Sequence, residues 1–347
     1  MAETTKIEWC DATFNPWMGC TRVSPACDDC YAARSTPART LGVTWGPGEP
    51  RRRTSDANWK LPGQWNAKAA REGRRLRVFC ASLADVFDNE VPALWRQQLM
   101  SLIADTPNLD WLLLTKRIGN AARMLSDASM HDGRLLTADD AYRPPANLWI
   151  GATVCNQAEY DRDIGKLLRT PAAVHFLSIE PMLGPIDMRM GGAALPDYSA
   201  HRPLAPLNWV ICGGESGPKA RPMHPDWACS LRDQCAAAGV PFLFKQWGEW
   251  QPISQQPEAL TSSLYVSNRK AAPHEDQSAI DELYGRSCTV EQTVQHLDGS
   301  VHHFLEPNAF PRGAMTMYRV GKKAAGRTLD GITHDGFPAP GAAPGDA

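Results

Sequence analysis

The stretch "DWLLLTKR", residues 110–117, is an unbroken apolar run that ends in polar and basic residues. Such a run fits a strand buried on both faces of a parallel sheet, because a half-exposed strand would alternate between apolar and polar residues. Five further runs share this pattern: "RVFCASLADVF" (77–87), "NLWIGATV" (147–154), "VHFLSIEP" (174–181), "NWVICGGES" (208–216) and "PFLFKQW" (241–247). The sequence therefore predicts six buried strands.

The segments between these runs predict helices. Successive runs are about 30 residues apart, the length of one βα unit. Pro92 is expected at the first position of one helix, and Pro225 at the first position of another that Gly239 ends. Since no strand is followed by G-x-G-x-x-G, we expect a (β/α) barrel, complete or partial, rather than a dinucleotide-binding open sheet. The segment "ATFNPWMG" (12–19) could add a first strand just before Cys20.

The character of the chain changes near residue 251. Residues 1–250 are expected to form the barrel, and the Pro-, Ser- and Gln-rich residues 251–312 a polar insertion or lid with no buried strand before "AMTMYRVGKK" (314–323). Residues 313–337 are expected to return and pack on the barrel. Residues 338–347 are expected to be a disordered tail.

Charge and hydropathy limit the classes of function. Lys and Arg total 36 against 38 Asp and Glu, so the protein has no overall positive field for promiscuous nucleic-acid binding. Arg51, Arg52 and Arg53 form a basic run that we expect to be a solvated face. No cationic leader precedes an apolar segment, and no apolar run reaches the roughly 18 residues of a membrane span, so we expect a cytoplasmic protein with reduced cysteines and no membrane contact.

The stretch "GCTRVSPACDDCYA" (19–32) gathers Cys20, Cys27 and Cys30 in a C-x6-C-x2-C arrangement. A closed structural zinc site normally has four ligands, and the nearest other thiol is Cys10. Three readings remain open: Cys10 completes a four-thiolate zinc or iron–sulfur site, the three thiols hold a four-iron cluster whose fourth iron is free, or the thiols have no function. A free iron can chelate S-adenosylmethionine, and one electron then breaks a carbon–sulfur bond.

The cysteine loop resembles a variant of the radical S-adenosylmethionine motif, and "CDDCY" (27–31) is similar to the ending found in the photoproduct-lyase-like branch. Together with "FLSIEPMLGPI" (176–186), "WVICGGESGP" (209–218) and "RVGKKAAGRTLDG" (319–331), it resembles the phage-associated three-Cys-motif family, which is considered radical-SAM-like. The usual motif is C-x3-C-x2-C, so the first gap is longer here. The resemblance implies a radical-SAM-type barrel with a 4Fe-4S cluster on the three cysteines and S-adenosylmethionine as cofactor.

Polar side chains at the ends of the predicted strands should meet at one mouth, because the βα loops of a barrel lie on the same side. The candidates for cofactor binding are Ser82, Lys116, Glu180 and Glu215. A buried carboxylate needs a partner, so Glu180 and Glu215 are expected either to pair with a cation such as Lys116 or Lys245 or to receive the ammonium group of a ligand. The segment "GKKAAGR" (321–327) is either a phosphate contact or a solvated helix start.

Two functions are compatible with these observations. The first is a radical-SAM-like iron–sulfur enzyme that acts on an unknown substrate, for which the resemblance suggests a nucleic acid or nucleotide, and that needs an electron donor or partner protein. The second is a metal-stabilised protein without turnover, in which zinc or a closed iron–sulfur site staples the N-terminal loop and the chain binds nucleic acid or a protein.

Overall fold

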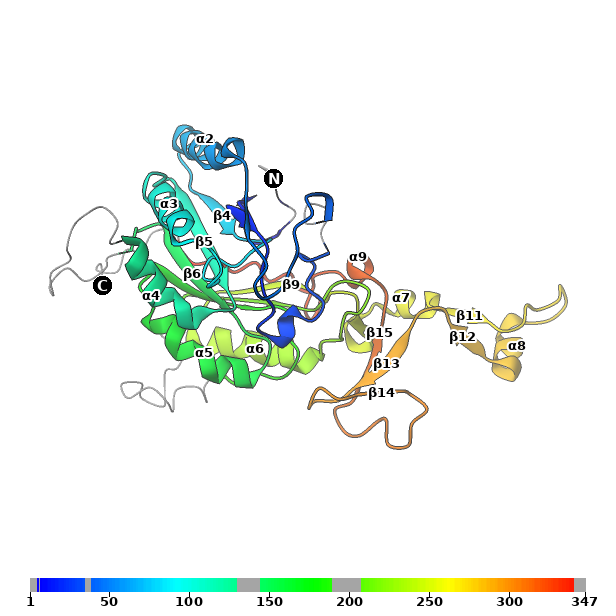
Figure 1. The fold of residues 1–347 in the computed structure, drawn as a ribbon. Helices are drawn as coiled ribbons and strands as arrows, with labels where there is room; N and C mark the ends of the chain where they lie inside the picture. Colours follow the sequence, from blue (N-terminus) through cyan, green and yellow to red (C-terminus); the bar gives the residue numbers. More distant parts are fainter. Residues whose placement is uncertain (1–4, 6, 35–38, 130–143, 189–206, 340–347) are drawn as a thin grey trace.

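A seven-stranded parallel sheet forms the centre of the protein (Figure 1). The computed structural model describes residues 5, 7–34, 39–129, 144–188 and 207–339. The strands follow one another across the sheet in the order β1 (Ala12–Thr13), β4 (Leu76–Cys80), β5 (Leu109–Thr115), β6 (Leu148–Thr153), β7 (Val174–Ile179), β8 (Trp209–Gly213) and β9 (Phe242–Gln246). The sheet curls into a half-barrel and does not close, so the partial form of the predicted barrel is confirmed.

All six strands predicted from apolar runs are present in this sheet, and the extra first strand before Cys20 exists as β1. Each pairs in parallel with its neighbour; Val78 lies opposite Trp111, for example. The first strand is short because Pro16 cannot donate to a sheet. The chain then forms β2 (Trp17–Met18), which pairs antiparallel with β3 (Arg52–Arg53) and encloses the cysteine loop between them.

Helices cover one face of the sheet (Figure 1). They are α2 (Asp56–Glu72), α3 (Ala93–Ala104), α4 (Ile118–Ser129), α5 (Gln157–Arg169) and α6 (Pro225–Ala238). The predicted limits of α6 are confirmed, with Pro225 in the first turn and Gly239 ending it at φ +68°. The position of Pro92 was wrong by one residue: its ψ of 132° is not helical, so it precedes α3 as the N-cap.

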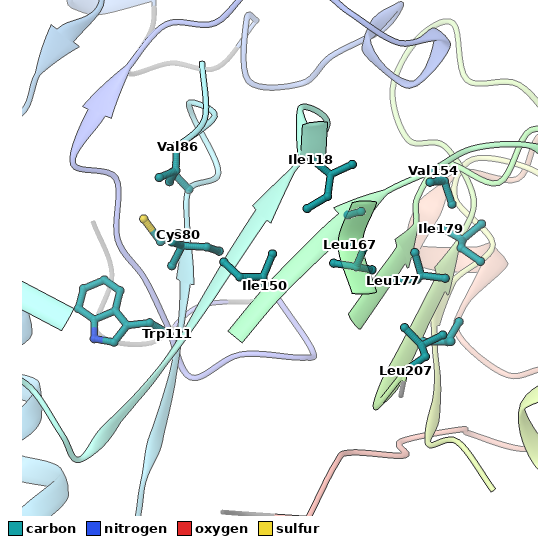
Figure 2. Packing of buried hydrophobic residues seen from close by; sticks show 14 of the residues in the cluster. Cys80, Val86, Trp111, Ile118, Ile150, Val154, Leu167, Leu177, Ile179 and Leu207 are labelled. Carbon is teal, nitrogen blue, oxygen red and sulfur yellow. The ribbon is translucent and has the colours of Figure 1, made fainter. Parts of the chain in front are cut away.

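The two faces of the sheet carry different cores. The helix-facing core is mostly aliphatic, and Figure 2 shows part of it, including Cys80, Ile150 and Leu177. Alternate residues of the same strands point to the opposite face, where an aromatic cluster surrounds Trp209. A Cβ on Gly151 would lie 2.3 Å from the ring of Phe176, so this packing requires glycine there.

Residues 251–318 build a second, antiparallel sheet beside the half-barrel. Its order is β10 (Gln251–Pro252), β15 (Met315–Tyr318), β13 (Gln292–Gln295) and β14 (Val301–His302). An arm made of α7 (Glu258–Ser263), β11 (Tyr265–Ser267), α8 (Gln277–Tyr284) and β12 (Arg286–Cys288) projects from it (Figure 1). The expectation that no buried strand precedes residue 314 was wrong, since β13 is buried. Its sequence, "QTVQ", looks polar, but the amide of Gln295 donates to Pro222 O over 2.9 Å.

The returning segment runs along the edge strand β9. After α9 (Lys322–Ala325), Phe244 donates its N–H to His334 O over 3.0 Å, and Gly336 donates to Phe242 O over 2.9 Å. The indole of Trp209 donates to Gly336 O over 2.7 Å. The segment therefore covers the open edge of the half-barrel. Residues 340–347, most of the predicted tail, lie outside the described residues. Among the described helices, none has the length and apolar character to cross a bilayer.

Candidate functional site

A cavity of about 720 Å³ opens at the carboxyl ends of the parallel strands. Its wall contains residues at or just after the end of each parallel strand, together with the cysteine loop, as expected for a barrel mouth. Apart from the alternative ligand Cys10, every residue that the sequence singled out for metal or cofactor binding lies on this wall: Cys20, Cys27, Cys30, Ser82, Lys116, Glu180 and Glu215. Segments up to 195 positions apart are thereby brought to one site, since Cys20 and Glu215 share the wall.

Local turns present the cysteines to the cavity. Gly19, at φ +102°, turns the chain out of β2 just before Cys20. A 3-10 turn, η1 (Pro25–Cys27), follows, and Ser24 caps it by accepting the N–H of Ala26 over 3.1 Å. Cys30 then donates its N–H to Cys27 O over 3.3 Å. In the described part of the chain no three His, Cys, Asp or Glu side chains are close enough together to hold a metal ion. The three thiols share a wall but are not drawn together.

Arg117 links Cys20 to the barrel. Its Nη1 donates to Cys20 Sγ and to Asp85 Oδ2, each over 3.2 Å, and its Nη2 donates to Thr21 O. The carboxylate of Asp85 also accepts from the Thr115 hydroxyl over 2.7 Å. Burial, with a smaller contribution from Asp85, raises the pKa of Cys20 to about 11, and Arg117 opposes this shift. Arg117 is thus the group that favours a thiolate at this position.

Arg51 holds the other side of the loop. Its side chain is 0% exposed and pairs with Asp88 over 2.8 Å and Glu90 over 2.6 Å. It also donates to the Thr21 hydroxyl over 2.7 Å, next to Cys20. The prediction of a solvated basic face was therefore wrong for Arg51. Its partners Asp88, Glu90 and Thr21 are at least 30 positions away in the sequence, so the basic run alone could not indicate them.

Glu215 has a partner that the sequence did not suggest. Arg221 donates to both carboxylate oxygens, from Nε over 2.8 Å and from Nη2 over 2.7 Å, so the expected pairing with Lys116 or Lys245 was wrong for this residue. The same guanidinium donates to Asp28 Oδ2 over 3.1 Å and to Pro25 O over 3.0 Å. Arg221 therefore ties the end of β8 to the turn that carries Cys27.

Glu180 pairs with Lys245, one of the two expected cations, over 2.9 Å. Burial lowers the pKa of Lys245, but the Glu180 carboxylate outweighs it, and the pKa lies above its ordinary value. A Cβ on Gly213 would come within 2.7 Å of Glu180 Oε1, and one on Gly214 within 1.9 Å of Trp247 O. Close packing thus accounts for both glycines of "GGES": Gly213 lies against the ion pair and Gly214 against the backbone of Trp247.

Ser82 lies in a hydrogen-bonded corner with Asn15. The Asn15 amide donates to Ser82 Oγ over 2.9 Å, and Asn15 Oδ1 accepts the N–H of Leu83 over 2.8 Å. The carbonyl of Ser82 accepts from the hydroxyl of Tyr31 over 3.1 Å. Sequence reasoning missed Asn15, although its place two positions after β1 was a signal of the kind used for the other strand ends.

Two lysines on the wall differ from the other charged groups. Within the described residues, the ammonium groups of Lys116 and Lys322 make no ion pair or hydrogen bond. Five further residues of the wall each have a buried polar atom without a partner: Glu8, Trp9, Trp45, Thr153 and Gln246. Unpaired buried polar atoms are uncommon in folded proteins, and a ligand or an ordered water can satisfy them. The wall therefore has unused hydrogen-bonding capacity.

Cys10, the candidate fourth ligand, lies elsewhere. It packs in the aromatic cluster with Trp9 and Phe79 and is not among the residues that line the cavity. Burial raises its pKa to about 12. Since burial also raises the pKa of Cys20, it is position rather than pKa that separates Cys10 from the three cysteines of the loop.

A family model described as a protein of unknown function, DUF5131, matches residues 4–338. The chain belongs to the DUF5131 family. The match spans the half-barrel of this DUF5131 protein, its arm and its returning segment. All the residues of the cavity wall lie within the matched range. No curated protein and no solved structure matches the chain. The function must therefore be argued from the site itself.

Proposed function

We propose that this DUF5131 protein is an iron–sulfur enzyme of the radical-SAM type, which reductively cleaves S-adenosylmethionine to act on a nucleic-acid or nucleotide substrate. The observation that carries the proposal is the position of the cysteine loop. Three thiols on a loop just after the first strand line a cavity at the carboxyl ends of a parallel half-barrel. The likeness of the loop to the radical S-adenosylmethionine motif, and of the chain to the phage-associated three-Cys family, gives further support.

The donor set suits a 4Fe-4S cluster with one free iron. Three thiols are supplied by Cys20, Cys27 and Cys30, whereas the fourth candidate, Cys10, does not line the cavity. Because the thiols are not drawn together in this structure, their side chains must converge when a cluster assembles. Such a cluster supplies one-electron reductive cleavage of a carbon–sulfur bond of S-adenosylmethionine, with an external reductant as the electron source.

The residues of the chain have distinct tasks in this proposal. Arg117 donates to the sulfur of Cys20 and offsets the negative charge that three thiolates bring to the site. Lys116 is next in sequence, and its ammonium group has no partner among the described residues, so it is suited to the cofactor's carboxylate. Glu180 is suited to its ammonium group, which would replace the ammonium of Lys245. Glu215 is a poorer candidate because Arg221 occupies both of its oxygens.

The alternative, a metal that only staples the loop, is less well supported. Arg51, Arg117 and Arg221 already fix the loop through buried or half-buried ion pairs and hydrogen bonds, so no metal is needed to hold it. In the staple model, replacing any of the three cysteines should unfold the loop. In the enzyme model, the variants stay folded and lose the cluster.

Anaerobic reconstitution with iron and sulfide tests the proposal. Ultraviolet–visible and electron paramagnetic resonance spectra should show a 4Fe-4S cluster that Cys27→Ala abolishes and Cys10→Ala retains. Cys288→Ala, in the arm, is the matched control. After addition of a reductant, S-adenosylmethionine should yield 5′-deoxyadenosine and methionine. A colourless protein with one zinc per chain would contradict the proposal. Loss of metal in Cys10→Ala would favour the closed four-thiolate site.

A further inference from the structure

Tyr31 presents an aromatic ring on the cavity wall. The side chain is 62% exposed, yet its hydroxyl donates to Ser82 O over 3.1 Å, at the end of β4. The hydroxyl is thus anchored while the ring stays open, which makes the ring a fixed surface on which a planar group can stack.

Lys322 is a cation without an acidic partner. Four of the five acids on the wall, Asp29, Asp85, Glu180 and Glu215, pair with Arg34, Arg117, Lys245 and Arg221, respectively. The fifth, Glu8, forms no ion pair with a described residue. No described residue forms an ion pair with Lys322, the one described wall residue that follows Gln246 in the sequence. The helix that carries it is fixed to the barrel, because Gly321 donates to Glu249 O over 3.0 Å and Trp247 to Gly326 O over 3.2 Å. An exposed ammonium group without an ion pair, on a helix whose backbone is fixed, suits an anionic ligand.

Thr153 and Gln246 add neutral polar groups to the same wall. They are only 3% and 6% exposed, and the Thr153 hydroxyl and the Gln246 carbonyl oxygen have no hydrogen-bond partner in the described part of the chain. Leaving such groups unpaired costs stability, so a ligand that supplies donors and acceptors is favoured. The polar edge of a nucleobase has both.

We infer that the ligand of this cavity is a phosphorylated nucleoside, whose base stacks on Tyr31 and pairs with Thr153 and Gln246 and whose phosphate binds Lys322. This inference rests on the proposed function in one respect: the ligand is the substrate of the same site. The charge and the polar groups of the cavity wall narrow the substrate class to phosphorylated nucleosides. A cavity of about 720 Å³ is within the size range of small-ligand sites.

Binding is measured by calorimetric titration of the full chain, kept anaerobic, in cluster-loaded and metal-free forms. The probes are adenosine, adenosine monophosphate and a single-stranded trinucleotide with a 5′-phosphate. The monophosphate should bind about tenfold more tightly than adenosine, the gain expected of one charge-assisted contact. Tighter binding of the trinucleotide assigns the site to single-stranded nucleic acid, and equal binding assigns it to free nucleotides; both outcomes support the inference.

Three variants locate the contacts. Lys322→Gln should bring the ratio between monophosphate and adenosine to about one, while Lys323→Gln, whose lysine does not line the cavity, should keep the ratio of about ten. Tyr31→Leu should weaken all three probes, and Tyr31→Phe, which retains the ring, should weaken them less.

Several results would overturn the inference. They are equal affinity of the wild-type protein for adenosine and its monophosphate, equal effects of Lys322→Gln and Lys323→Gln, and loss of monophosphate binding when S-adenosylmethionine is saturating, which would assign the probe to the cofactor's own adenosine site. A chain that assembles no cluster but binds the monophosphate through Lys322 contradicts the proposed function alone. A cluster that cleaves S-adenosylmethionine in a chain with no preference for phosphate contradicts this inference alone.

Discussion

Arg117 Nη1 lies 3.2 Å from Cys20 Sγ and donates a hydrogen bond to it, although 97 positions separate the two residues. The same nitrogen donates to Asp85, and both partners of this ion pair are buried. One guanidinium therefore connects the first cysteine of the loop with the ends of β4 and β5. The sulfur and the carboxylate compete for the same positive charge, and this competition makes the position testable.

Replacing Arg117 by Met should destabilise the fold and impair metal loading. The change leaves the buried Asp85 carboxylate without its cation, which costs about 3–5 kcal/mol when one partner of a buried pair is removed. The double variant Arg117→Met/Asp85→Asn should recover most of the stability, because no unpaired charge remains. It should not recover iron content after reconstitution, since Cys20 still lacks its donor. Urea unfolding and iron analysis measure the two effects. Full iron loading of the double variant would contradict the role at Cys20.

Arg51 and Arg52 form a matched pair for a stability test. Arg51 is fully buried between Asp88 and Glu90, whereas its neighbour Arg52 is exposed. Arg51→Met should lower the free energy of unfolding by about 3–5 kcal/mol, because two carboxylates lose their cation. Arg52→Met should change it by less than about 0.5 kcal/mol, as is usual for surface sites. Denaturant unfolding followed by circular dichroism compares them. Similar losses for both variants would mean that the Arg51 network does not stabilise the loop.

Parts of this protein could be predicted from its sequence because their physical causes are local. The strands of a parallel sheet are buried on both faces, so an apolar run such as residues 110–117 can be recognised as a strand. The polar residues that follow these strands meet at one mouth. Arg51 and Arg221 could not be assigned, because their partners come from other loops and follow no period. The strand β13 was hidden because its buried Gln295 is satisfied by a distant carbonyl. The sequence alone also could not decide the place of Cys10, which depends on which face of the half-barrel its side chain packs against.

The link through Arg221 predicts how Glu215 acts on the cysteine loop. Glu215→Gln removes the charge that orients Arg221, so the hydrogen bonds from Arg221 to Pro25 and Asp28 should weaken. Alkylation of Cys27 by iodoacetamide in the metal-free protein should then become faster by about threefold to tenfold, which corresponds to about 1 kcal/mol of lost order. Arg221→Lys should have a similar effect, because Lys cannot hold a carboxylate in a bidentate pair.

Mass spectrometry of the labelled peptides measures this rate, with Cys288 in the arm as the internal reference. The double variant Glu215→Gln/Arg221→Lys should be no faster than either single variant if the two residues act together. Additive rates would show that Glu215 and Arg221 influence the loop separately.

His224 gives the protein a dependence of stability on pH. The buried imidazole caps α6: its Nδ1 accepts the N–H of Asp226 over 3.2 Å, and its Nε2 donates to Gly313 O over 2.9 Å. A proton on Nδ1 would remove the acceptor, and burial lowers the pKa of His224 below its ordinary value near 6.5. The unfolded chain therefore binds this proton at a higher pH than the folded protein. The contribution of His224 to the free energy of unfolding is therefore fully present above about pH 6.5. It decreases as the pH falls from there towards the pKa of His224 in the folded protein.

His224→Asn should separate this effect from other titrations. Asn remains an N-cap for α6 but does not titrate, and it loses the bond to Gly313, so the variant should be less stable by about 1 kcal/mol at pH 8. Between pH 7 and 5 its free energy of unfolding should fall less steeply than that of the wild type. The two slopes should differ by up to about 1.4 kcal/mol per pH unit, the value for one proton. Some slope should remain, because burial also lowers the pKa of His175. Urea unfolding at several pH values measures both slopes; equal slopes would mean that His224 has the same proton affinity in the folded and unfolded chain.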